Sequence, residues 1–115
     1  MQNSEARPSL VLIVEDIDWL RSAMTNSLER LGYRTAQATD DAEAFAVVER
    51  EPIDVILTEE QMPTFGRLMS RLHSALSKVP VVIINPDAEE GARHGDAYLV
   101  ADYDDICSLL AGMVH

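Results

Sequence analysis

The stretch LVLIVED at residues 10–16 decides the fold of this chain. Its first five residues are all apolar, as expected of a strand that is buried on both faces of a parallel sheet. Similar apolar runs follow at residues 53–58 and 80–84. The segments between these runs carry apolar residues at helical spacing, so strands and helices alternate along the chain. This alternation predicts an α/β domain in which helices cover a parallel sheet.

The element boundaries follow from periodicity and from stop and cap residues. Gly32 ends a helix over residues 18–31, and Asp40 with Glu43 resembles an N-cap pair that opens the next helix. Pro86 and two later glycines leave room for only a short fourth helix before residue 96. The predicted strands are 10–14, 33–38, 53–58, 80–84 and 97–100, and the other predicted helices are 41–50, 65–77 and 104–114.

Length and charge limit the classes of function. A chain of 115 residues supports one hydrophobic core, so we expect a polar tail over residues 1–9 and a single domain over residues 10–115. The net charge of -11, without a Lys/Arg cluster, disfavours nucleic acid and membrane as partners. No apolar run resembles a signal peptide or a membrane span, and the lone Cys107 suits a reducing compartment. A cytoplasmic protein is expected.

Acidic residues follow two of the predicted strands directly. Glu15 and Asp16 come after the first strand, and Glu59 and Glu60 come after the third. Functional groups of an open parallel sheet gather at the carboxyl ends of its strands, so these carboxylates should converge and could hold Mg²⁺. An equally good interpretation of isolated acids is helix capping, and it applies to Asp16, Asp18, Asp40 and Asp87.

Two stretches together resemble a known family. Residues 11–16, VLIVED, are followed by Arg21, and residues 54–63 read DVILTEEQMP. Both resemble the response-regulator receiver family of two-component signalling, and the likeness runs from about Leu10 to Met113. The resemblance implies a flavodoxin-like, doubly wound, five-stranded parallel sheet of order 2-1-3-4-5 with helices on both faces.

The resemblance also assigns roles to single positions, and several of them are altered here. Glu15 and Asp16 match the acid pair that holds Mg²⁺ in the family. Glu59 stands where the family has its phosphoacceptor Asp, which makes the side chain one methylene longer. Asn85 replaces the Thr or Ser that hydrogen-bonds the phosphoryl group, and Ala101 replaces the Lys. A degenerate acceptor pocket is therefore expected.

Tyr98 matches the aromatic residue that changes rotamer when the family's receivers are activated. Because the acceptor pocket is altered at Glu59, Asn85 and Ala101, we expect a non-enzymatic pseudo-receiver. Such a domain is a signalling module that binds another protein independently of phosphorylation. The partner would be a kinase, a regulator or a second copy, bound through the face of the fourth helix, the fifth strand and the last helix. No cofactor is required, although Glu15, Asp16 and Glu59 could bind Mg²⁺ weakly.

Two alternatives remain open for the acid cluster. It could support weak Mg²⁺-dependent phosphoryl transfer or phosphatase activity, or Glu59 could mimic a phosphorylated Asp and hold the domain in an active-like state. Asn85 also suits an N-cap of the short helix. Trp19 is expected to half-bury its ring beside Asp16.

Overall fold

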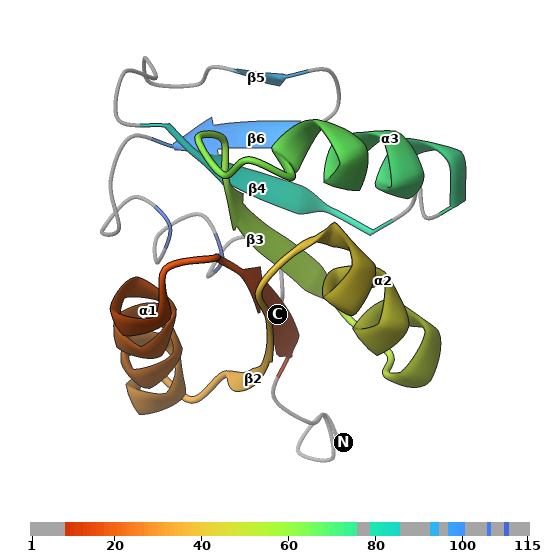
Figure 1. Cartoon of the computed structure of the whole chain (residues 1–115). Coiled ribbons are helices and arrows are strands. Elements are labelled where there is room, and N and C mark those ends of the chain that lie inside the picture. Colours follow the sequence, from red (N-terminus) through yellow and green to blue (C-terminus); the bar gives the residue numbers. More distant parts are fainter. Residues whose placement is uncertain are drawn as a thin grey trace.

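In the computed structural model, a six-stranded sheet forms the centre of the molecule (Figure 1). The structure describes residues 9–75, 79–85, 93–94, 97–100, 106 and 110. The strand order is β2-β1-β3-β4-β6-β5. The strands are β1 (Leu10–Val14), β2 (Arg34–Ala38), β3 (Val55–Glu59), β4 (Val81–Ile84), β5 (Arg93–His94) and β6 (Ala97–Val100).

The strands β1, β2, β3 and β4 pair in parallel, as predicted from the alternation of strands and helices along the chain. Strand β1 lies between β2 and β3, and β4 pairs with the other edge of β3. The predicted order 2-1-3-4 is confirmed. All five residues of β1 are buried, which explains why polar residues are missing from this strand.

The far side of the sheet differs from the five-stranded, fully parallel sheet that was predicted. Strand β6 pairs in parallel with β4 at the place expected for the fifth strand. A further strand, β5, pairs with β6 in antiparallel orientation and makes the edge. It contains only Arg93 and His94, which is too short to leave a periodic signal in the sequence. The predicted short fourth helix falls mainly on residues 86–92, which lie outside the described residues.

The faces of the sheet are covered, within the described ranges, by the helices α1 (Asp18–Arg30), α2 (Asp41–Arg50) and α3 (Phe65–Ala75). Figure 1 shows α1 on one side of the sheet, and α2 and α3 together on the other. The alternating residues of β1 divide between two cores accordingly. Leu12 packs in the core that includes α2 and α3, whereas Ile13 packs in the core that includes α1. Both faces of the central strand are therefore apolar by necessity.

The ends of the helices follow from local chemistry. Helix α1 ends at Arg30, and Gly32 then adopts a φ of 97°, a left-handed conformation that favours glycine. At the start of α2, the backbone N–H of Glu43 donates to Asp40 Oδ1 at 2.9 Å, which confirms the predicted cap. The Glu43 carboxylate in turn accepts from the backbone N–H of Thr39.

The predicted last helix is described only at Ile106 and Leu110. Both residues are helical and fully buried, and they join the core that contains α1. Their spacing of four residues places them on one helical face, as expected. Within the described part of the chain, no helix combines the length and apolar character that a membrane span requires.

Candidate functional site

The parallel register brings the acidic strand ends together. Val14 pairs with Thr58, so the next residues along β1 and β3 are Glu15 and Glu59. Glu15 is fully buried, Glu59 is half-buried and Asp16 is exposed. One carboxylate oxygen from each of the three residues lies within 4.8 Å of the others. The predicted convergence of Glu15, Asp16 and Glu59 is therefore present, and we call these three residues the acid cluster.

Glu15 is the most constrained member of the acid cluster. Its backbone N–H donates to the carbonyl of Ala38 at 3.0 Å, and its Oε2 accepts from the backbone N–H of Ile17 at 3.1 Å. Its Oε1 is buried and has no hydrogen-bond partner. A buried carboxylate oxygen without a partner is costly, because folding removes its water without replacing it.

The proton affinity of Glu15 reflects this environment. Burial raises the pKa of the Glu15 carboxyl to about 7, with further contributions from Asp16 and Glu59, while the hydrogen bond from Ile17 acts in the opposite direction. Burial disfavours the charged form, and a neighbouring negative charge does the same. Near neutral pH, Glu15 therefore exchanges between its protonated and ionised forms.

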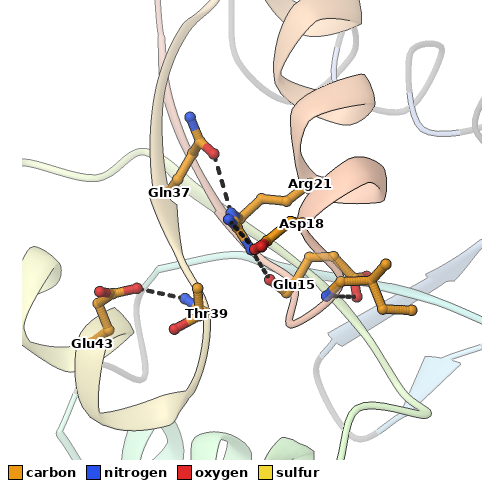
Figure 2. A network of polar contacts seen from close by, with 7 residues as sticks. Glu15, Asp18, Arg21, Gln37, Thr39 and Glu43 are labelled. Carbon is orange, nitrogen blue, oxygen red and sulfur yellow. Dashed lines mark hydrogen bonds and ion pairs between the residues drawn. The ribbon is translucent and has the colours of Figure 1, made fainter.

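Arg21 fixes the turn from which Glu15 and Asp16 project. Figure 2 shows its guanidinium directed at three acceptors. It donates to the backbone carbonyl of Glu15 at 2.8 Å, to Asp18 Oδ1 at 2.7 Å and to Gln37 Oε1 at 3.2 Å. The planar guanidinium thus ties the end of β1 to the first turn of α1 and to β2. The sequence identified Arg21 only as part of a motif and did not predict this role.

The capping interpretation of Asp16 and Asp18 is wrong. The N-cap of α1 is Ile17, and no side chain caps this end of the helix. Asp18 lies in the first turn, where its carboxylate pairs with Arg21. Asp16 precedes the N-cap residue and does not cap the helix, and its side chain belongs to the acid cluster. Asp87 lies outside the described residues.

A second polar contact links the ends of β3 and β4. The side-chain amide of Asn85 donates to Glu60 Oε1 at 2.5 Å. The backbone N–H of Glu60 also donates to the carbonyl of Ile84, at 3.2 Å. Asn85 is therefore held by Glu60, which directly follows the neighbouring strand β3. The sequence flagged both positions but gave no reason to pair them.

The sequence profile of the response regulator receiver domain family matches residues 11–107. The chain belongs to this family. Among curated relatives, this receiver domain is 35% identical over 109 residues to the "Gliding motility regulatory protein" of Myxococcus xanthus, which covers 86% of the chain and 14% of that protein. It is 32% identical over 88 residues to "Sensor histidine kinase RcsC" of Salmonella typhimurium, covering 73% of the chain and 9% of the kinase.

The chain thus spans only a small part of the length of these relatives. Among solved structures, the receiver domain is similar to a chain of the complex between histidine kinase ThkA and response regulator protein TrrA of Thermotoga maritima. The TM-score is 0.77 at 13% identity, and the match covers 93% of this chain and 99% of that chain. At this identity the likeness shows the fold.

Tyr98 and Ala101 are two further positions of the predicted receiver site. Tyr98 is in β6, where its backbone pairs with Val82 of β4. Ala101 follows β6 and lies outside the described residues. Trp19 is 72% exposed, so the prediction of a half-buried ring is wrong. It lies in the first turn of α1, which faces away from both cores at this position.

Proposed function

We propose that this receiver domain is a pseudo-receiver: it binds a partner protein in two-component signalling through a surface that does not depend on phosphorylation. The observation that carries this proposal is the place of Glu59. It ends β3 beside Glu15 and Asp16, where the family resemblance locates the phosphoacceptor. The acceptor position is thus filled by a side chain that is one methylene longer than Asp.

The length of the side chain matters because phosphoryl transfer depends mainly on positioning. A misplacement of about 1 Å can lower the rate of an enzyme-like step roughly a hundredfold. The backbone cannot easily move to compensate, because Glu59 pairs with Ile84 in the centre of the sheet. The added carbon-carbon bond therefore displaces the attacking oxygen relative to Glu15 and Asp16.

The charge around Glu59 also opposes transfer. Arg21 forms an ion pair with Asp18, and Arg67 forms one with Asp41, so neither arginine is paired with a member of the acid cluster. The family's Lys is replaced by Ala101, which has no charge to offer. An anionic phosphodonor would approach three carboxylates without that cation, and the developing phosphoryl charge would lack its main stabilisation.

Asn85 supports the same proposal. Its amide donates to Glu60, so this donor is directed to the residue that follows β3. In the family that the sequence resembles, this position carries a Thr or Ser hydroxyl that hydrogen-bonds the phosphoryl group. An amide held by a carboxylate favours one arrangement of the β3 and β4 ends, as a fixed binding surface would require.

The partner is proposed to be a protein, with a kinase as the first candidate. One similar structure contains a histidine kinase bound to a response regulator protein. We further propose that the partner binds the face of the fourth helix, β6 and the last helix, that binding needs no cofactor, and that the domain is cytoplasmic and not an enzyme. The negative charge of the chain favours a partner with a basic surface.

Phosphorylation with acetyl phosphate and Mg²⁺ tests the proposal by intact mass. The wild-type mass should not change. Glu59→Asp alone should also stay unlabelled, because Asn85 and Ala101 still leave the transferred group without its hydroxyl and its cation. The triple variant Glu59→Asp, Asn85→Thr, Ala101→Lys should gain one phosphoryl group, which makes it the positive control. Residues that act as a unit are expected to be strongly non-additive.

Two results would contradict the proposal. A hydroxylamine-sensitive adduct on wild-type Glu59 would show that the site still accepts phosphate. Equal labelling of Glu59→Asp and the triple variant would show that Asn85 and Ala101 are not disabling, so that only one methylene separates this domain from a working receiver.

A further inference from the structure

Helix α3 differs in charge from the rest of this acidic domain. The chain has 20 acidic and 9 basic residues, yet no Asp or Glu occurs between Glu60 and Asp87. The same stretch contains Arg67 and Arg71, which are both exposed on α3. Two cations on a helix that carries no acid create a local positive potential on a surface that is negative overall.

The two arginines are held at the boundary between α3 and α2, which lie side by side on one face of the sheet (Figure 1). Arg67 Nη2 donates to Asp41 Oδ1 of α2 at 3.3 Å. The guanidinium carbon of Arg71 lies 5.0 Å from the centre of the Phe45 ring, also on α2. Side chains four residues apart are neighbours on a helix, so the two guanidinium groups project next to each other. We call Arg67 and Arg71 the arginine pair.

The contacts with α2 leave the arginine pair accessible to a further ligand. The Arg67 side chain is 72% exposed, and its bond to Asp41 uses one of the five N–H donors of a guanidinium. The Phe45 ring attracts the cation of Arg71 without neutralising it. The Asp41 side chain is only 10% exposed, so an anion that approaches from solvent meets the arginines before it meets this carboxylate.

We propose that the arginine pair binds an acidic segment of a partner protein, in which two carboxylates lie about one helical turn apart. The two parallel N–H groups of a guanidinium match the two oxygens of a carboxylate. The spacing of the arginines along α3 sets the spacing of the carboxylates that they can bind together. This surface is built from α2 and α3 and is separate from the binding face proposed for the pseudo-receiver, so either proposal can fail without the other.

The small size of the positive surface favours a short acidic segment over nucleic acid. The arginine pair extends along about one turn of α3, or about 5 Å, whereas the chain as a whole has a net charge of -11. A long polyanion would extend beyond the pair and be repelled, because exposed charges act over about 8–10 Å at physiological salt. A helix with two carboxylates and otherwise neutral side chains avoids this repulsion.

An NMR titration of the ¹⁵N-labelled domain with a defined peptide tests the proposal. The probe is an Ala-rich peptide of about 16 residues, long enough to form a helix, with two Glu residues one turn apart. The control peptide has Gln at both positions. The Glu peptide should shift the amide signals of α2 and α3, and the Gln peptide should bind about tenfold or more weakly. The affinity for the Glu peptide should fall as the ionic strength rises from about 0.01 to 0.15 M.

Substitutions connect peptide binding to the arginine pair. Arg67→Gln and Arg71→Gln should each weaken binding of the Glu peptide about tenfold or more, because each removes charge-assisted hydrogen bonds. Arg67→Lys keeps the charge but not the planar guanidinium and should recover only part of the affinity. The matched control Arg30→Gln removes an exposed arginine from α1, on the other side of the sheet, and should leave the affinity unchanged. Unchanged amide signals in β1 and β3 check that each variant is folded.

Any of four results would overturn the proposal. Unshifted α2 and α3 amides at low ionic strength would show that the arginine pair binds no acidic segment. Equal affinity for the Glu and Gln peptides would show that carboxylates are not recognised. Wild-type affinity in folded Arg67→Gln and Arg71→Gln variants would place the peptide elsewhere. Finally, a short single-stranded oligonucleotide of the same charge that binds the arginine pair as tightly as the Glu peptide would assign this surface to nucleic acid.

Discussion

Replacing Glu15 by Gln should make the protein more stable at alkaline pH. The Gln side chain has nearly the same shape, and its carbonyl oxygen can still accept the hydrogen bond from the Ile17 N–H. It cannot ionise, however, so the variant avoids burying a negative charge beside Asp16 and Glu59. The gain should appear only where the wild-type carboxyl is charged.

The magnitude follows from the shift of the pKa. The pKa of Glu15 rises from 4.5 to about 7, mainly because of burial, and each unit corresponds to about 1.4 kcal/mol. Because the native state binds this proton more tightly than the unfolded chain, ionisation of Glu15 lowers the free energy of unfolding as the pH rises from 4.5 to 7. The full loss, above pH 7, is about 3 to 4 kcal/mol.

Urea unfolding in the presence of a chelator, measured at several pH values, checks this prediction. Relative to wild type, Glu15→Gln should be equally stable near pH 4.5 and about 3 to 4 kcal/mol more stable above pH 7. Glu49→Gln, an exposed control on α2, should stay within about 0.5 kcal/mol of wild type throughout. A difference between Glu15→Gln and wild type that does not change with pH would refute the reasoning.

Further substitutions test the local structure around the site by urea unfolding. Arg21→Ala should cost about 2 kcal/mol, because the carbonyl of Glu15 and the side chains of Asp18 and Gln37 lose their donor, and Arg21→Lys should recover only part of this loss. Asp40→Ala removes the side-chain cap of α2 and should cost about 1 kcal/mol, whereas Asp40→Asn should cost much less. Gly32→Ala should cost about 1 kcal/mol. No atom blocks the added Cβ, so the cost comes from the backbone φ of 97°, which disfavours a residue with a side chain.

Much of the fold could be predicted because its signals are local. An uninterrupted apolar run gives β1, helical spacing gives α1 to within one residue at its end, and Asp40 marks the start of α2. Leu31 shows where local spacing is misleading. It continues the apolar stripe of α1, yet it lies at the C-cap and is 57% exposed, because the helix ends before this residue can reach the core.

The candidate site could be predicted only in part. The convergence of Glu15, Asp16 and Glu59 follows from one topological rule, since neighbouring parallel strands end at the same edge. The contacts that shape the site cannot be predicted from this rule, because they depend on the strand register and on the reach of long side chains. Asn85 meets Glu60 only because β3 and β4 pair with Glu59 opposite Ile84. The edge strand β5 was not predicted, because two residues are too few to show a periodic pattern of apolar side chains.

The central claim is that this receiver domain has lost its phosphorylation switch. The most direct measurement is a pair of amide ¹H–¹⁵N correlation spectra, one with saturating Mg²⁺ and one with Mg²⁺ and acetyl phosphate. If the claim is correct, the two spectra coincide, including the amides of β4 and β6 next to the proposed binding face. A second set of peaks that appears with acetyl phosphate and decays as the donor is consumed would contradict it.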